Sequence, residues 1–168
     1  MPRVTLKSAT YLGERTDPPV EKGGKPWTHD AFNVVLECGG RTFETPWNSG
    51  IGNRVPRKTF PRQEPKSRLG APGVFYSVSG GWEPGKPIPP KAEDVLSSLL
   101  MDASGTDETF DDWASSYGYD TDSRRALALY LTCQETARKL RTFLGRSVLD
   151  VQQEWGDFED AAKALCAE

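Results

Sequence analysis

Apolar and polar residues alternate with a period of two in the clearest segment of the first half. In residues 32–38, which read Phe-Asn-Val-Val-Leu-Glu-Cys, apolar side chains recur at every second position, as a strand with one buried face requires. Gly39 and Gly40 follow, and they accept the positive φ angles of a two-residue hairpin turn into residues 41–45. The pattern predicts a hairpin whose register pairs Cys38 with Arg41, Leu36 with Phe43, Val34 with Thr45 and Phe32 with Trp47.

Two more runs of the first half favour extended structure. Residues 4–12 predict a strand that ends at Gly13 and the turn-prone residues 16–19, and residues 74–78 predict another short strand. Residues 50–72 have no periodicity, and we expect a mobile loop over residues 52–72. The prolines between residues 84 and 90 are then expected to form a stiff connector.

Beyond the connector the apolar spacing changes from two to 3.6 residues, which predicts helices. The first helix has apolar residues at positions 95, 96, 99 and 100 and ends at Gly105. A second helix is expected to run from a Thr106 N-cap to a Gly118 C-cap. A third helix begins near Asp120 or Asp122.

The third helix ends at Gly145, and Ser147 with Asp150 opens a fourth helix in the manner of a capping box. Gly156 is expected to kink or split this fourth helix. The third and fourth helices carry heptad-like apolar seams, formed by Ala126, Tyr130, Cys133, Ala137, Leu140 and Leu144 and by Val148, Val151, Trp155, Phe158, Ala162 and Leu165. Because a tight turn joins them, we expect an antiparallel pair within one chain. The alternative is a homodimer through the seam in residues 126–144 or 148–165.

Together these elements predict an α+β fold, with a small antiparallel sheet in residues 1–88 packed against a four-helix half in residues 89–168. A chain of 168 residues holds one well-buried core and is too short for two ordinary domains. We therefore expect the two halves to form one compact unit.

Charge is divided unequally between the halves. Residues 1–90 carry 13 Lys or Arg against 8 Asp or Glu, a net charge of +5, and residues 91–168 carry 8 against 16, a net charge of −8. No apolar run is long enough to span a bilayer, and no apolar segment of a secretion signal follows the first residues. The three cysteines form neither a disulfide framework nor a metal-site spacing, which favours a reducing cytoplasm.

Residue patterns that carry catalysis are scarce. His29, the only histidine, lies in a stretch that predicts a turn, where a histidine is more often an exposed loop residue than a general base. No Ser or Cys stands in a nucleophile motif, and no glycine-rich phosphate loop is present. Asp107, Glu108, Asp111 and Asp112 could supply oxygen ligands to Mg²⁺, but as i, i+4 pairs on one helix they would repel each other. We therefore expect a protein that is not an enzyme and holds no metal or cofactor.

Acidic residues are concentrated at one place in the helical half. Six of them fall within 16 residues that contain no Lys or Arg: Asp107, Glu108, Asp111, Asp112, Asp120 and Asp122. Acids favour the first turn of a helix, which would explain Asp107, Glu108, Asp120 and Asp122 almost completely. The alternative is a negative surface that imitates nucleic acid and meets a basic groove on another protein.

A basic run in the first half offers a second candidate surface. It consists of Arg54, Arg57, Lys58, Arg62, Lys66 and Arg68, with Phe60 available to stack on a base. Such a run is typical either of a solvated linker or of an arm that follows a phosphate backbone.

Part of the helical half resembles a segment of uncharacterised accessory proteins of tailed phages and prophages. The similar stretches are residues 89–103, residues 110–114 (Phe-Asp-Asp-Trp-Ala) and residues 118–126 (Gly-Tyr-Asp-Thr-Asp-Ser-Arg-Arg-Ala). The resemblance covers residues 89–145, and its most specific part is Tyr-Asp-Thr-Asp-Ser-Arg. Small phage proteins of this kind include anti-CRISPR inhibitors of host defence complexes, and others serve phage DNA replication and recombination.

The resemblance implies a phage or prophage context. Together with the cation-free acidic run and the scarcity of catalytic motifs, it predicts a non-enzymatic accessory protein that acts by binding in the cytoplasm of the infected bacterium. The expected function is inhibition of a CRISPR-Cas nuclease complex through the acidic helical surface. The alternative is a nucleic-acid-binding accessory protein of phage DNA metabolism that uses residues 54–68.

Overall fold

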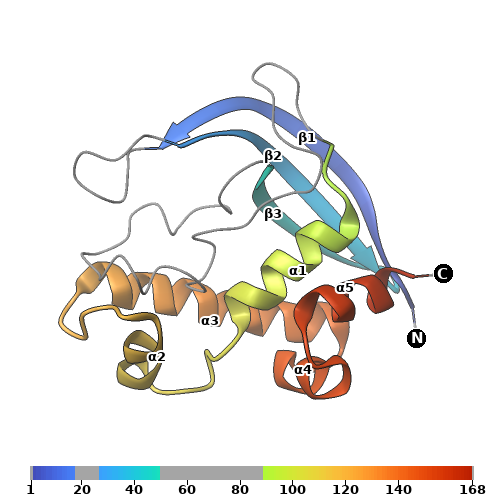
Figure 1. The fold of residues 1–168 in the computed structure, drawn as a ribbon. Coiled ribbons are helices and arrows are strands. Elements are labelled where there is room, and N and C mark those ends of the chain that lie inside the picture. Colours follow the sequence, from blue (N-terminus) through green and yellow to red (C-terminus); the bar gives the residue numbers. More distant parts are fainter. Residues whose placement is uncertain (1, 18–26, 50–88, 168) are drawn as a thin grey trace.

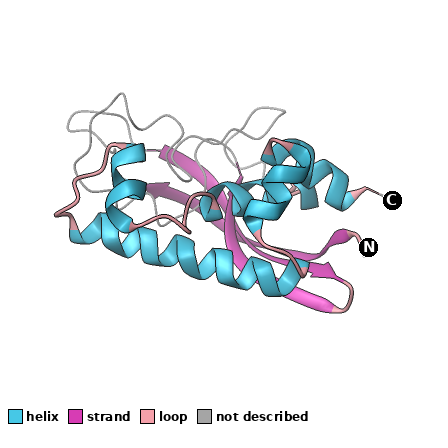
Figure 2. Ribbon diagram, turned by 90° about the horizontal axis from the view of Figure 1, so that it is seen from below, coloured by secondary structure: helices cyan, strands magenta, loops and turns pink. Residues whose placement is uncertain are grey.

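A sheet and a set of helices form two layers in the computed structural model, which describes residues 2–17, 27–49 and 89–167. The strands are β1 (Val4–Asp17), β2 (Trp27–Cys38) and β3 (Arg41–Ser49), in the order β1-β2-β3 with antiparallel neighbours. The described helices are α1 (Ala92–Ala103), α2 (Phe110–Tyr117), α3 (Arg124–Leu144), α4 (Val148–Trp155) and α5 (Phe158–Cys166). The sheet arches over the helices, which all lie on its concave side (Figures 1 and 2). The predicted α+β fold is therefore confirmed.

The hairpin of β2 and β3 has the predicted register. Cys38 pairs with Arg41, Leu36 with Phe43, Val34 with Thr45 and Phe32 with Trp47. Gly39 and Gly40 have φ angles of +57° and +80°, a region that favours glycine and matches the twist of the two strands. A Cβ on Gly39 would also lie 2.8 Å from Cγ of Pro2. Both backbone conformation and space therefore require glycine at the first turn position.

Both strands of the first pair are longer than the alternation predicts. Gly13 does not end β1 but lies at a bulge with a φ angle of +98°, so the strand bends and continues to Asp17. β2 begins at Trp27, where a turn was expected, and its first residues pair with this extension of β1. A bulge shifts the alternation of side chains by one residue. The part of β1 after Gly13 therefore does not continue the period-two pattern that predicts the first part. The strand predicted at residues 74–78, the loop at 52–72 and the proline connector up to residue 88 lie outside the described residues.

The fourth predicted helix is two helices. Ser147 begins α4 as predicted, and its Oγ accepts a hydrogen bond from the backbone N–H of Asp150 at 3.1 Å. Gly156, with a φ angle of +80°, ends α4. The Asp157 side chain then accepts a hydrogen bond from the N–H of Asp160 at 2.8 Å, which starts α5 in a new direction.

The main core lies between the concave face of the sheet and α1, α3, α4 and α5. Trp47 of β3 is fully buried there, and its Nε1 donates a hydrogen bond to Oγ of Ser98 in α1 at 3.3 Å. The Ser98 hydroxyl donates in turn to the Asp94 carbonyl oxygen at 2.9 Å, so the polar edge of the tryptophan is satisfied without a solvent contact. The core draws on both halves of the chain: Val4, Phe32, Val34, Leu36, Cys38, Phe43, Trp47, Val95, Leu96, Leu99, Leu100, Ala103, Leu140, Phe143, Leu144, Val148, Val151, Ala161, Ala162 and Leu165.

A second apolar cluster lies between α2 and the N-terminal half of α3. Trp113 is fully buried at its centre, and the other buried members are Ala114, Tyr119, Ala126, Leu129, Tyr130 and Cys133. We call this set, with Phe110 and Tyr117 packed against it, the aromatic cluster. α3 therefore spans both cores, with residues 126–133 in the aromatic cluster and residues 140–144 in the main core.

The helices keep their apolar seams inside the chain. The seam residues of α3 and of the α4–α5 pair are buried in the two clusters or packed against them, which leaves the outward residues of these helices for any contact with another molecule. Those outward positions are largely polar or charged. In the described part of the chain, no helix combines the length and apolar character needed to cross a membrane.

Candidate protein-binding surface

Six carboxylates lie on α2 and on the two loops that flank it. Asp107 and Glu108 lie in the loop before α2, Asp111 and Asp112 in its first turn, and Asp120 and Asp122 in the loop before α3. All six side chains are exposed, and residues 103–123 contain no Lys or Arg. We call these six residues the acidic corner.

The position of the α2 N-cap shows that the helix begins later than expected. The preference of acidic residues for a first helical turn therefore does not explain all the acids near α2. Thr106, the expected cap, is buried, and its Oγ1 donates a hydrogen bond to the Ala103 carbonyl oxygen at 2.7 Å, a local bond that closes the turn after α1. The N-cap is Thr109, which accepts from the N–H of Asp112 at 3.2 Å. Asp107 and Glu108 therefore precede the helix, and the expected i, i+4 repulsion with the next two acids on one helix is wrong.

α3 likewise begins later than expected. Ser123 caps it by accepting a hydrogen bond from the N–H of Ala126 at 3.2 Å, so Asp120 and Asp122 precede the helix, and its first turn contains no acidic residue. The favourable interaction of an acid with the helix dipole falls off within the first turn. It accounts for the two acids at the start of α2 and leaves the other four without this explanation.

The aromatic cluster fixes α2 on α3 beneath the acidic corner. The Trp113 ring has its centroid 5.3 Å from those of Tyr117 and Tyr130 and 5.4 Å from that of Tyr119, within the range of favourable ring contacts. Burial raises the pKa of Tyr117 and of Tyr119 above the ordinary tyrosine value, because the cluster excludes the water that would stabilise a charged phenolate. The acidic corner therefore lies on and beside a helix, α2, that is tightly packed against α3.

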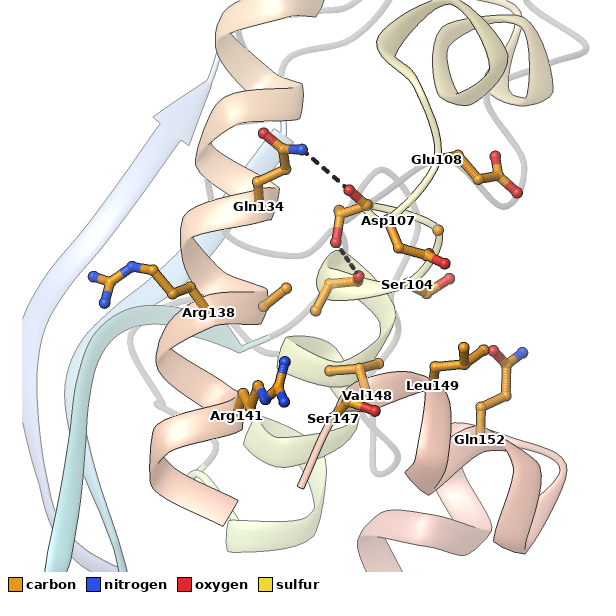
Figure 3. A pocket seen from close by; sticks show the side chains of 14 residues that line it. Ser104, Asp107, Glu108, Gln134, Arg138, Arg141, Ser147, Val148, Leu149 and Gln152 are labelled. Carbon is orange, nitrogen blue, oxygen red and sulfur yellow. Dashed lines mark hydrogen bonds between the residues drawn. The ribbon is translucent and has the colours of Figure 1, made fainter. Parts of the chain in front are cut away.

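Hydrogen bonds from α3 hold the backbone of the loop that carries Asp107 and Glu108. The Tyr130 hydroxyl donates to the carbonyl oxygen of Glu108. Gln134 Nε2 donates to the carbonyl oxygen of Thr106 at 3.1 Å (Figure 3). It also donates to the Tyr130 hydroxyl at 2.8 Å. The backbone is thus fixed while the carboxylates point away from it, which lowers the ordering cost of a contact with another molecule.

The acids of the corner have no cationic partners within the part of the chain that the structure describes. Arginines of the helical half pair elsewhere, Arg138 with Glu135 and Arg146 with Glu154. None of the six carboxylates forms an ion pair with another described residue. Their mutual repulsion would be relieved by cations of another molecule.

A groove of about 550 Å³ opens beside the acidic corner. Asp107 and Glu108 stand on its loop wall, the side chains of Gln134, Arg138 and Arg141 come from α3, and Val148 and Leu149 of α4 lie at the far end (Figure 3). The sequence predicted the two acids but not the α3 residues. Gln134 follows the seam residue Tyr130 by four positions and so shares its helix face, which is the one signal that could have pointed to it.

Histidine and cysteine residues, which often carry catalysis, lie in β2, α3 and α5 of the described chain. His29 lies within β2 rather than in a turn, with Arg15 as its backbone partner in β1. Among the described residues, no three His, Cys, Asp or Glu side chains form a group that could hold a metal ion. Cys38 and Cys133 are buried, and burial raises the pKa of the Cys166 thiol to about 12, which suppresses its nucleophilic thiolate form.

The second candidate surface lies outside the described residues. It comprises Arg54, Arg57, Lys58, Phe60, Arg62, Lys66 and Arg68. Nucleic-acid binding through this run stays a prediction from the sequence.

No protein-family model, no curated protein and no solved structure matches the chain. The resemblance of residues 89–145 to phage accessory proteins therefore also stays a prediction.

Proposed function

We propose that the protein acts by binding, with the acidic corner as its contact for a basic surface on another protein. One observation carries the proposal: Asp107, Glu108, Asp120 and Asp122 stand outside the helices, exposed and without a cation among the described residues. Their loops flank a helix that the aromatic cluster holds in place. A fixed array of uncompensated carboxylates speeds encounter with a basic partner and disfavours acidic ones.

The partner class that we propose is a bacterial defence nuclease, and in particular a CRISPR-Cas effector complex. Such complexes hold nucleic acid in positively charged channels, which an acidic surface complements. The resemblance of residues 89–145 to phage accessory proteins supports the same class. In this proposal the protein occupies the channel in place of nucleic acid and blocks cleavage without performing chemistry.

A charge-neutralised variant tests the proposal. Asp107→Asn, Glu108→Gln, Asp120→Asn and Asp122→Asn together remove the four carboxylates that lie outside the helices. The matched control, Glu37→Gln, Glu44→Gln, Glu154→Gln and Glu159→Gln, makes the same change in net charge on the sheet, α4 and α5. Both sets replace a carboxylate by an amide of similar shape.

Binding to purified effector ribonucleoproteins and inhibition of their DNA cleavage are then measured at several salt concentrations. We expect the corner variant to bind at least about tenfold more weakly, equivalent to roughly 1.4 kcal/mol, and the control to bind like the unmodified protein. Equal binding by the corner variant would show that the acidic corner is not the contact surface.

Single-stranded DNA in the same assay separates this function from the alternative. A complex that weakens steeply with salt and is unaffected by the corner variant would assign the function to the basic run of residues 54–68.

A further inference from the structure

The groove beside the acidic corner carries opposite charges at its two ends. Asp107 and Glu108 lie at one end, and Arg141 lies at the other, next to the N-cap and first turn of α4 (Figure 3). Arg138, the other arginine of the groove, is engaged by Glu135, with its Nε donating to Oε2 at 2.9 Å. Arg141 forms no ion pair with any described residue. It is thus the cation available to a ligand.

Apolar side chains line the groove as well, and two of them, Val148 and Leu149, lie at the same end as Arg141 (Figure 3). Ala103, Ala137 and Val148 line it, and Leu149 contributes a side chain that is 49% exposed. Gln134 and Arg141 are seven residues apart on α3, which is roughly 10 Å along a helix axis. A single ion cannot bridge that length, whereas three residues of extended chain or two turns of helix can.

We infer that this groove binds a peptide segment of the partner protein that is basic at one end and carries an apolar residue beside an acidic residue at the other. The basic side chain meets Asp107 and Glu108, the apolar side chain covers Leu149 and Ala137, and the carboxylate meets Arg141. The inference rests on the proposed function, because Asp107 and Glu108 belong to both the acidic corner and the groove. It adds a requirement that imitation of nucleic acid does not contain, namely an acidic residue in the partner.

Two exposed positions allow the groove to be altered without touching the cores. Leu149→Arg replaces an exposed apolar side chain of the groove by a longer charged one, and Arg141→Glu reverses the charge of one end. Leu131→Arg is the matched control for the first, because Leu131 is 53% exposed on α3 and lies outside the groove. Lys139→Glu is the control for the second, since it makes the same charge change at another exposed position of α3 that does not line the groove.

The probe is a library of short random peptides, selected on the immobilised full chain and remeasured singly by fluorescence anisotropy. We expect the selected peptides to share a basic, an apolar and an acidic position in a fixed order. Leu149→Arg should weaken their binding about tenfold or more, and Leu131→Arg should not. Arg141→Glu should weaken the binding of the selected peptides to a similar extent. This variant should regain affinity for peptides whose acidic residue is replaced by Lys, and damage to the fold cannot produce such a reversal.

Other outcomes overturn the inference. Selected peptides that lack an acidic position, that bind both groove variants like the unmodified protein, or that show no reversal with Arg141→Glu would exclude the groove as a peptide site. Selection that yields no peptide above the Leu149→Arg background would exclude it as well.

The effector complexes of the previous test separate failure of the groove from failure of the proposed function. If Asp120→Asn with Asp122→Asn, outside the groove, weakens effector binding while both groove variants bind normally, the acidic corner stands and the groove inference fails. If the groove variants lose the peptides but no effector complex binds the unmodified protein, the groove stands and the proposed partner class fails.

Discussion

The Arg41 guanidinium donates a hydrogen bond through Nε to the carbonyl oxygen of Phe143 at 2.8 Å, across 102 positions of sequence. Arg41 is the first residue of β3, and Phe143 lies in the last turn of α3, where carbonyl oxygens lack a partner within the helix. The rings of Phe43 and Phe143 meet edge to face beside it, with centroids 5.8 Å apart. The turn end of the hairpin is therefore fastened to the end of the longest described helix.

Removing this bond should lower stability measurably. We expect Arg41→Ala to reduce the free energy of unfolding by about 1–3 kcal/mol, because an orphan helix carbonyl loses a charged donor. Arg41→Lys should recover only part of the loss, since a lysine amine cannot reproduce the planar guanidinium geometry. Urea denaturation measures the difference. Lys7→Ala, which breaks only a 3.9 Å exposed pair with Glu37, is the control, and equal losses from both variants would contradict the role of Arg41.

Stability should also distinguish the two kinds of acid in the acidic corner. Asp111→Asn and Asp112→Asn lie in the first turn of α2 and should each cost about 0.3–1 kcal/mol through the helix dipole. Asp107→Asn, Glu108→Gln and Asp120→Asn lie outside the helices, so thermal denaturation should show unchanged or slightly higher stability. If these three substitutions clearly lowered the thermal stability, the carboxylates would have a structural role instead.

The aromatic cluster should open separately from the main core. Trp113→Ala removes its central side chain, and we expect a loss of about 3–5 kcal/mol of local stability. Hydrogen exchange should then show early loss of protection in α2 while β2 stays protected, because the sheet packs in the other core. Uniform loss of protection throughout the chain would show that the two clusters unfold as one.

Cysteine labelling should be slow in the folded protein. Burial raises the pKa of Cys166 to about 12, so the thiol is protonated at pH 8 and its reactive thiolate becomes appreciable only as the pH approaches that value. Cys38 and Cys133 are buried as well. A chromogenic thiol reagent should react with all three only after denaturation. Rapid labelling of the folded protein at pH 8 would contradict the packing of Cys166.

Sequence patterns found the elements whose signals are local. The Leu36–Phe43 pairing followed from two glycines and an alternation, and Gly118 and Gly145 marked helix ends because φ values of +75° favour glycine. The strand end predicted at Gly13 was wrong, because glycine is common both at strand ends and at β-bulges. Thr106 and Thr109 are both plausible caps by type, and the choice depends on the turn after α1.

Only part of the candidate surface could be predicted from the sequence. The six acids could be read as a cluster because they are close along the chain. Gln134 and Arg141 could not be assigned to the same place, since they reach it only when α3 packs beside the loop before α2. Long-range packing of this kind leaves no local signal in a single sequence.

α3 contributes to both the aromatic cluster and the main core, and this limits which insertions and deletions the protein can accept. Each residue added to or removed from α3 between Cys133 and Leu140 would rotate one cluster relative to the other by about 100°. Asp107 and Glu108 would then no longer face the α3 and α4 residues with which they line the groove, while the sheet still packed normally. Only changes of about seven residues, two full turns, would restore the relative angle. We expect this stretch of α3 to tolerate substitution on its outer face and to resist insertion or deletion.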